Sequence, residues 1–521
     1  MNNPLRPNVL AAPVETPYRV SLLRQLSAYV RCFIALPFLL IVANTHAQTL
    51  APQFQTRQAD NSDTLVFTAA QFFEAVVNFH PLVRQAALFP EEARAEIMQA
   101  RGAFDPKLAS YFDQKEFGKG PNGSTNDNLY YSRWESSLSV PVAPLGADLK
   151  VSYNRNRGQF LNPEASTRGT GLLAVGVEVP VGQSMWLDAR RTTLQQARLG
   201  VNLADADRLK AINKTLFDAA KAYWEWYLAY RAFRLVDEGY QLANVRFQGT
   251  RQRALVGEAA IIDTTEALIT VQDRLVQRQQ AEVELQNVRL RLSTFLWAAN
   301  DQPVDMPASV LPQAAPSGLI SEETVQNLLS QALQRHPELL KLEAKTEQLQ
   351  LEERFRRALL QPQINLSASL LRLTPIPNGL TSSADYYTFR PDNYKVGVDF
   401  VFPLFLRKER GKLKQVQIKG QQLVLERQQT VRDIQNDVLA ARNDIQTLAQ
   451  QIQVQEQTYL NQRRLVQAEQ QRFDLGESSL FLVNSREAKL IDFGVKLEEL
   501  RTKYQKALAA LWYVAGTNQV Q

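Results

Sequence analysis

The stretch QQLVLERQQTVRDIQNDVLAARNDIQTLAQQIQVQEQTYLNQRRLVQAEQQRFDL, residues 421–475, decides the fold of this chain. It contains neither glycine nor proline, and an apolar or aromatic residue returns at every seventh position: Val424, Val431, Val438, Ile445, Ile452, Tyr459, Val466 and Phe473. A second series fills the other seam position for part of the length: Ile434, Ala441 and Leu448. This spacing predicts a coiled-coil stripe on one long helix. Because one helix cannot bury the stripe alone, the sequence requires partner helices.

The same unit occurs earlier in the chain. Moved back by 219 residues, the repeat falls on seven apolar or aromatic residues out of eight: Asp205, Ile212, Ala219, Trp226, Phe233, Tyr240, Phe247 and Ala254. The pairs Gly257-Glu258 and Gly476-Glu477 come after the two runs. Glycine in the left-handed conformation is a common helix C-cap, so each pair predicts a helix end and a reversal. We therefore expect a long helical hairpin that is present twice.

Residues 1–47 are typical of a secretory signal peptide. Arg24 and Arg31 precede an apolar run over residues 32–43, and the sequence then suits cleavage between Ala47 and Gln48. The run is shorter than the roughly 20 residues of a membrane-spanning helix. A membrane anchor that is retained is the alternative. Cys32 lies at the start of the run and not at the cleavage site, which argues against lipidation.

Composition excludes several classes of function. Removal of residues 1–47 takes away the single cysteine and lowers the net charge from +6 to +3, because four arginines and one glutamate leave. His80 and His336 are then the only histidines, and both precede a proline that suits the first turn of a helix. The remaining chain therefore has too few cysteines and histidines for a cysteine or histidine metal site or a cysteine nucleophile. We expect no enzyme activity, no cofactor, no metal and no nucleic-acid partner.

Strand patterns come after the short helices of each half. Apolar and polar residues alternate over 364–370 and again over 396–402, with a polar loop at 374–393 between them, which predicts a hairpin. Val175 to Glu178 matches Val396 to Asp399, and the shorter offset implies an insertion before Val175. Alternation over 134–140 and 149–153, joined across 144–148, fits an extra hairpin there. We expect four strands from the first half and two from the second, although the extra hairpin could lie outside a barrel.

Short two-sided strands in a secreted chain are typical of outer-membrane β-barrels. Aromatic residues near the predicted strand ends support this class: Trp186, Tyr386, Tyr387, Phe402 and Phe405. Four to six strands cannot close a conducting barrel, since closure takes at least about eight. The strands must therefore be pooled from several chains. A small soluble sandwich capping a coiled coil is the alternative.

Helix lengths complete the expected organisation. Residues 187–255 and 407–475 would each form a helix of roughly 100 Å, and shorter return helices cover 258–297 and 477–512. The predicted domains are the signal peptide (1–47), a first repeat (48–302, strands about 108–181, tip near 257), a linker (303–317), a second repeat (318–516, strands about 364–405, tip near 476) and a tail (517–521).

This order of elements resembles the TolC family of outer-membrane efflux proteins. Leu296-Trp297 and Leu511-Trp512 end the two halves, and residues 472–480 (RFDLGESSL) are similar to the family's second tip. The resemblance implies a mostly α-helical homotrimer with 4–6 strands per chain pooled into a membrane β-barrel, continued by a periplasmic tunnel of coiled-coil hairpins. It also implies outer-membrane lipids, a periplasmic adaptor and an inner-membrane pump of RND or ABC type as partners, in efflux or type I secretion. A periplasmic adaptor or a structural surface protein without a channel is the alternative.

The resemblance further implies a periplasmic gate at the tips, where this sequence departs from the family. Asp263 matches an acid of the first tip, whereas Phe473 replaces a tyrosine, Ser478 an arginine, and Leu482 and Ser485 two aspartates. We therefore predict an apolar closure through Phe473, Phe481 and Leu482 that is less sensitive to divalent cations. For Asp263 alone, a capping or solvated role is the alternative.

The tips are also the predicted adaptor-docking surface, by position and by resemblance. The first comprises Ala254, Leu255, Val256, Gly257 and Glu258, and the second Leu475, Gly476 and Glu477. The alternative is that each glycine only makes the turn.

Overall fold

The protein is described from a computed structural model. It divides into two units, residues 1–60 and 61–521, and every described residue belongs to the second. The structure describes residues 66–117, 128–143, 146–158, 161–167, 171–183, 185, 187–316, 320–373, 389 and 391–517. The predicted signal segment with its Ala47–Gln48 cleavage site, three of the aromatics noted above (Trp186, Tyr386 and Tyr387) and most of the 374–393 loop lie outside these residues.

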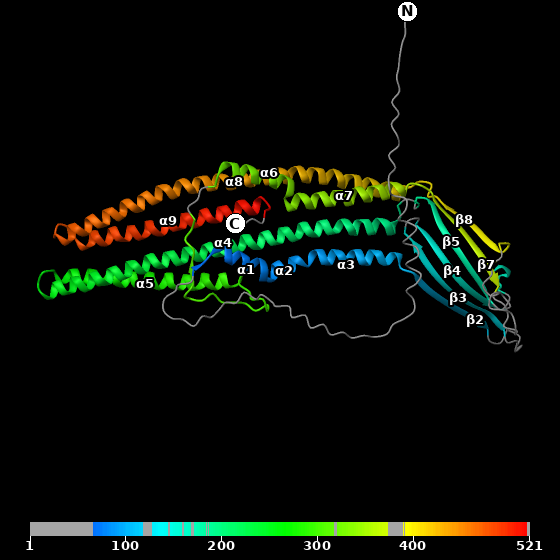
Figure 1. Cartoon of the computed structure of the whole chain (residues 1–521), viewed down its shortest axis with the longest axis horizontal. Coiled ribbons are helices and arrows are strands. Elements are labelled where there is room, and N and C mark those ends of the chain that lie inside the picture. Colours follow the sequence, from blue (N-terminus) through cyan, green and yellow to red (C-terminus); the bar gives the residue numbers. More distant parts are fainter. Residues whose placement is uncertain are drawn as a thin grey trace, which may run out of the picture. The chain divides into compact units, whose positions relative to one another are not determined.

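Two long helical hairpins dominate the second unit (Figure 1). The first consists of α4 (Ala189–Leu255) and α5 (Ile261–Ser293), and the second of α8 (Arg407–Asp474) and α9 (Leu480–Val514). Side-chain caps fix two of the starts. The Asp188 carboxylate accepts a hydrogen bond from the Arg191 N–H at 2.7 Å, and Ser479 caps α9. The predicted duplicated hairpins are confirmed.

The middle parts of the heptad seams lie in the core of the unit, whereas Val424, the first residue of the predicted α8 repeat, is 54% exposed. Ala219 and Trp226 of α4 belong to one buried cluster, and Val438 and Ile445 of α8 belong to another. The first cluster is strongly aromatic, with Tyr223 and Trp226 almost fully buried. Burial of these seams is the main favourable term for the hairpins, because apolar area removed from water stabilises by about 25 cal/mol per Å².

Shorter helices lie alongside the long ones toward the sheet (Figure 1). In the first half α3 packs on α4, and in the second half α7 packs on α8 and α4. The bounds are α1 (Ala69–Phe79), α2 (Pro81–Ala87), α3 (Phe89–Arg101), α6 (Glu322–Arg335) and α7 (Pro337–Ala358).

The two histidines sit at equivalent helix junctions. Nδ1 of His80 accepts a hydrogen bond from the Leu82 N–H at 3.2 Å, and Nδ1 of His336 accepts one from the Glu338 N–H at 3.2 Å. Each histidine is thus the N-cap of the helix that begins at the next residue, a proline. Burial lowers the pKa of both imidazoles, which keeps Nδ1 free to accept.

A small parallel sheet joins the start of the described chain to the segment between the halves. β1 (Val66–Phe67) pairs with β6 (Leu311–Pro312). The Tyr223 hydroxyl lies between them, since it donates to the Phe67 carbonyl at 2.8 Å and accepts from the Gln313 N–H at 3.2 Å. Residues on both sides of the first hairpin are thereby tied to the middle of α4.

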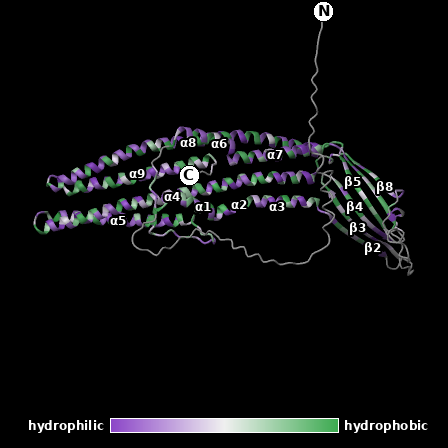
Figure 2. Ribbon diagram, viewed as in Figure 1, coloured by the Kyte–Doolittle hydropathy of each residue, from purple (hydrophilic) through white to green (hydrophobic). Residues whose placement is uncertain are grey.

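Six strands form one antiparallel sheet in the order β2-β3-β4-β5-β7-β8. The strands are β2 (Lys107–Phe117), β3 (Asn128–Val142), β4 (Ala147–Arg157), β5 (Leu172–Gly182), β7 (Gln363–Leu373) and β8 (Tyr394–Val401). Four come from the first half and two from the second, as predicted. The extra hairpin, β3–β4, is part of the same sheet and not outside it. Apolar and polar residues alternate along the strands (Figure 2).

In the part of the chain that the structure describes, no helix has the length and apolar character needed to cross a bilayer.

Candidate functional site: the helical tips and the polar contacts between the hairpins

The two tips have the same backbone geometry. Gly257 and Gly476 both adopt φ of +79°, the left-handed region predicted for them. In the first tip the Glu258 N–H donates to the Arg253 carbonyl at 2.8 Å, and in the second the Glu477 N–H donates to the Arg472 carbonyl at 2.8 Å. A Cβ at either glycine would meet nothing within 4 Å, so conformation and not space requires glycine.

Large apolar side chains are exposed around both turns. Leu255 is 72% exposed and Leu475 76%, and the next helices begin with exposed Ile261 and Phe481. Such clustered apolar exposure indicates an interaction surface. The predicted docking residues therefore lie where another protein can reach them.

The second tip contains a polar cluster that the first lacks. Glu469 is 5% exposed, accepts a hydrogen bond from the Ser478 hydroxyl, and lies 3.8 Å from the Arg472 guanidinium. The equivalent positions in the first tip are Thr250, in place of Glu469, and Ala259, in place of Ser478. The first tip therefore has neither the carboxylate nor the serine hydroxyl that binds it. The turn of the second hairpin is thus fastened to its own long helix by a buried acid.

The seam of α8 becomes polar on the way to this tip. The series Ile434, Ala441, Leu448 continues at the same spacing with Gln455, Gln462 and Glu469. Nε2 of Gln455 donates to the Phe493 carbonyl at 3.0 Å, and Nε2 of Gln462 donates to the Arg486 carbonyl at 2.8 Å. Hydrogen bonds to the backbone of α9 therefore replace apolar contact near the tip, and they fix the register of the two helices.

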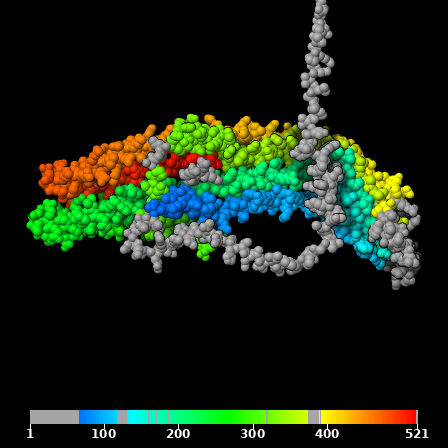
Figure 3. Space-filling view, in the orientation of Figure 1, coloured from blue at the N-terminus to red at the C-terminus, as the bar shows by residue number. Residues whose placement is uncertain are grey.

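A buried ion pair joins the two hairpins, which lie against each other along their length (Figure 3). Arg246 of α4 pairs with Glu487 of α9, and the two side chains are only 10% and 12% exposed. The guanidinium also donates to Asn484 Oδ1 at 3.0 Å and to Gln470 Oε1 at 3.2 Å, while Asn484 Nδ2 donates to Thr270 Oγ1 at 3.1 Å. All four helices of the two hairpins meet in this network.

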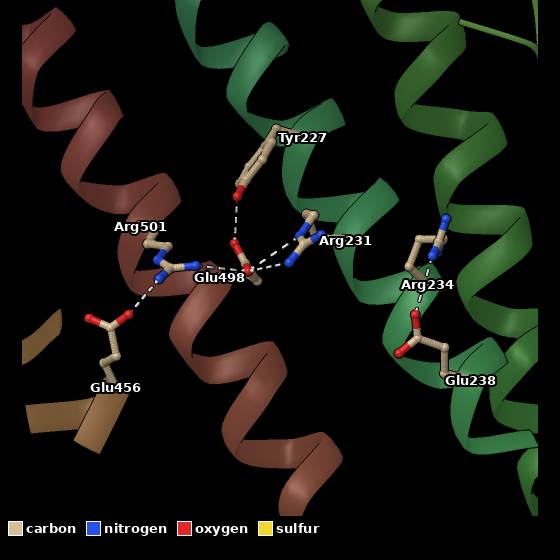
Figure 4. A network of polar contacts seen from close by, with 7 residues as sticks. All are labelled: Tyr227, Arg231, Arg234, Glu238, Glu456, Glu498 and Arg501. Carbon is tan, nitrogen blue, oxygen red and sulfur yellow. Dashed lines mark hydrogen bonds and ion pairs between the residues drawn. The ribbon is translucent and has the colours of Figure 1, made fainter. Parts of the chain in front are cut away.

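A second junction lies farther from the tips and is centred on Glu498 of α9 (Figure 4). Its carboxylate accepts from the Tyr227 hydroxyl at 2.6 Å, from Arg231 Nη2 at 3.0 Å and from Arg501 Nη1 at 3.2 Å. Burial, and then the bond to Glu498, raises the pKa of Tyr227 to about 12. The hydroxyl therefore stays a donor at any physiological pH.

Comparison with known proteins agrees with this architecture. The family model for outer membrane efflux proteins matches residues 328–517. The efflux pump outer membrane protein TtgC of Pseudomonas putida is 23% identical over 266 residues, which are 46% of this chain and 52% of that protein. The antibiotic efflux pump outer membrane protein ArpC of Pseudomonas putida matches to the same extent. The chain thus spans about half the length of the curated relatives it matches.

Solved structures match over nearly the whole chain. The CmeC outer membrane channel of Campylobacter jejuni is 13% identical and superposes with a TM-score of 0.58, covering 93% of this chain and 95% of that one. The Neisseria gonorrhoeae MtrE outer membrane channel is 16% identical, with a TM-score of 0.58 over 86% of this chain and 89% of that one. The chain therefore has the fold of these outer membrane channels, and the match to the outer membrane efflux family model lies in its second half.

The six predicted gate residues divide into two groups. Phe481 is 67% exposed and Leu482 40% exposed, while Asp263, Phe473, Ser478 and Ser485 are partly buried. Ser478 is held by Glu469. Within the described residues, the Asp263 carboxylate has no hydrogen-bond or ion-pair partner. The structure therefore brings Ser478 into a polar cluster of its own hairpin and leaves Asp263 unattached.

Sequence reasoning missed the charged residues that hold the helices and turns of the hairpins together, namely Glu469, Arg246, Glu487 and Glu498. One signal was present for Glu469, since it continues a seam series at heptad spacing. The Arg246–Glu487 pair had no such signal, because its partners are 241 residues apart.

Proposed function

We propose that the protein is the outer-membrane channel of a tripartite efflux or type I secretion system. It would be a passive conduit from the periplasm to the exterior. Three copies would pool their strands into a barrel among outer-membrane lipids, and their hairpins into a periplasmic tunnel. The match of residues 328–517 to the outer membrane efflux family model and the fold shared with outer membrane channels support this proposal. One observation carries the proposal. A six-stranded sheet with an apolar face is joined to the helices α4 and α8, which have 67 and 68 residues and are too long for a compact domain.

The partners are inferred from the same architecture. We propose that the exposed tips, residues 254–258 and 475–477, receive a periplasmic adaptor, and that the adaptor links them to an inner-membrane pump of RND or ABC type. Exposed Leu255 and Leu475 support an apolar contact there. The cargo would be chosen by pump and adaptor.

The gate is proposed to close through apolar side chains at the tips. Phe473, Phe481 and Leu482 would narrow the entrance, while Asp263 and Ser485 would border it. The buried network at Arg246 and Glu487 supports a second, polar part of the gate, because it holds the two hairpins together behind the tips. Opening would therefore need separation of apolar side chains and breakage of polar contacts.

Single-channel recording on the detergent-purified oligomer in a planar bilayer tests the conduit. We expect discrete channels of uniform size that open rarely, and more frequent opening after Phe481→Ser with Leu482→Ser. The matched control is Leu425→Ser, an exposed position far from the tips. A folded oligomer in which neither the native chain nor the opened variant conducts would contradict the proposal.

The apolar gate is tested in the same recordings. A trivalent cation added from the periplasmic side should block only at high dose, since Leu482 and Ser485 stand where the resemblance would place two aspartates. Block at low dose would contradict an apolar gate while leaving the conduit intact.

A further inference from the structure

One face of the six-stranded sheet carries large apolar residues in every strand, with Arg155, Arg157 and Arg372 on it toward one end. Register carries this face across the sheet, since Leu108 pairs with Leu138, Leu138 with Val151, and Val151 with Val175. It continues through Leu370 on β7, and farther along that strand Leu366 pairs with Val398 of β8. Many of its large side chains are exposed: Leu108, Phe112, Trp134, Leu138, Leu149, Val177, Leu366, Leu370, Tyr394, Val396, Val398 and Phe400.

The opposite face carries most of the polar side chains in the same register, together with Tyr111, Leu373 and Val401. Asp113 and Arg133 form an ion pair between β2 and β3, and Lys150 lies 3.9 Å from Glu135 between β4 and β3. Across β5, β7 and β8 this face carries Glu178, Asn365, Ser367, Ser369 and Asp399. A sheet with one lipid-compatible and one water-compatible face is the membrane-barrel pattern.

The β3–β4 hairpin belongs to this membrane face as fully as the other strands do. Trp134 and Leu138 of β3 and Leu149 of β4 are 39–41% exposed on the apolar side. By the internal repeat, β2 corresponds to β7 and β5 to β8, so β3 and β4 are the insertion. All six strands therefore share one membrane environment.

The two edges of the sheet suit pairing with another copy. Neighbouring strands are antiparallel throughout, so β2 and β8 run in opposite directions. An even number of strands lets β8 of one copy pair antiparallel with β2 of the next, as in other barrels. Both edges are apolar and exposed, with Leu108 80% and Val398 68% exposed, which unpaired edge strands avoid.

We infer that three copies close a barrel of eighteen strands through β8-to-β2 contacts, and that the inserted β3–β4 hairpin widens it. This inference rests on the proposed trimeric channel. With strands about 4.8 Å apart and tilted by about 40°, eighteen strands give a backbone diameter of about 36 Å. Twelve strands, the number without the insertion, give about 24 Å at the same tilt.

The wider barrel has a consequence for cargo. Three copies of α3, α4, α7 and α8 would surround the tunnel next to the barrel, and helices packed about 9–10 Å apart give it a diameter of about 35–38 Å. The eighteen-stranded barrel continues that bore without narrowing. Cargo size is then set at the tips, and bulky cargo that passes them meets no second constriction in the membrane.

Disulfide cross-linking tests the edge contact in a Cys32→Ser background. Ala109→Cys on the polar face of β2 is combined in turn with Lys395→Cys, Gly397→Cys and Asp399→Cys on the same face of β8, since the register between copies is open. At least one pair should give covalent trimers in denaturing gels. Ser137→Cys with Ser152→Cys, which pair within one chain, is the control and should give only monomers.

Electron cryomicroscopy of the native oligomer in lipid nanodiscs supplies the second measurement. We expect a trimer with eighteen strands, and a narrower barrel after deletion of residues 128–157, which removes β3 and β4. A closed trimer of twelve strands with β3–β4 outside the barrel, and no β2–β8 cross-link, would overturn this inference alone. A particle without a closed barrel would overturn the proposed channel as well.

Discussion

The two helical hairpins share a length and a turn but not a core. α4 and α8 have 67 and 68 residues, and both tips turn on a glycine with φ of +79°. The first hairpin buries aromatic residues around Tyr223 and Trp226, whereas the second replaces apolar seam residues near its tip with Gln462 and Glu469.

The two cores contribute differently: the apolar core mainly stabilises its hairpin, and the polar seam mainly specifies the register of its helices. Apolar seams gain stability from burial, while buried polar groups add little net free energy and penalise any register that leaves them unpaired. Toward the tip of the second hairpin a small slide along α9 would break the bonds of Gln455 and Gln462 together. We therefore expect the second hairpin to move between discrete positions, and the first to remain a rigid support.

The largest expected effect comes from Glu487→Ala, which breaks the buried ion pair between the two hairpins. The loss leaves Arg246 buried without its partner, and we expect unfolding to become easier by about 3–5 kcal/mol. Denaturant unfolding and opening frequency in bilayers measure it. Glu238→Ala is the control, because its pair with Arg234 is exposed (Figure 4) and should contribute under about 0.5 kcal/mol.

Removal of both charges sharpens that result. The double variant Arg246→Met with Glu487→Met should recover most of the lost stability, since no unpaired charge remains. If the double variant were as unstable as Glu487→Ala, loss of packing and not of charge pairing would be the cause.

The polar cluster of the second tip gives the next largest effect. Ser478→Ala removes the hydroxyl donor to buried Glu469, which should cost about 1–3 kcal/mol and raise the opening frequency. Ala259→Ser at the equivalent position of the first tip should change neither quantity, because Thr250 stands where the second tip has Glu469. Equal effects at both tips would remove the distinction drawn between them.

The glycine turn that the two tips share predicts a loss of stability that is equal at both tips and smaller than that of Ser478→Ala. Gly257→Ala and Gly476→Ala each place a Cβ in the left-handed conformation without a clash, so each should cost roughly 1–2 kcal/mol. Thermal unfolding of the two variants measures the penalties. A clearly larger loss at one tip would show that the turns, and not only the seams, differ between the halves.

The smallest effect is a pH dependence that the two halves share. Burial lowers the pKa of His80 and His336 below the ordinary 6.5, so protonation favours the unfolded chain. Stability from these groups is present above pH 6.5 and is lost as the pH falls below it. His80→Asn with His336→Asn keeps an N-cap at both junctions and should flatten the unfolding temperature between pH 7 and about 5. If the double variant kept the same dependence of unfolding temperature on pH, carboxylates and not these histidines would be the cause of that dependence.

Features of the fold with a local cause could be predicted from the sequence. Heptad spacing predicted the hairpins, the glycine positions predicted the turns, and alternation predicted the strands, including the β3–β4 insertion. The sheet order could not be derived locally, because the pairing of β5 with β7 depends on how the two halves pack.

The candidate site was less predictable for the same reason. The helical tips were located from their turns, but the buried carboxylates were not. Glu498 meets Tyr227 from 271 residues away, which requires the relative register of α4 and α9. Glu469 carried a periodic signal, yet a charged residue is usually expected on the solvated face of a helix.

The pairing of β1 with β6 has a consequence for the order in which the chain folds. Synthesis delivers β1 early, but its partner strand and the Gln313 N–H that binds Tyr223 come after the whole first hairpin. The aromatic core around Tyr223 is therefore completed only when the segment that connects to the second half has emerged. Although the two halves are repeats in sequence, the first repeat is not an independent folding unit, since it needs the connecting segment to complete its core.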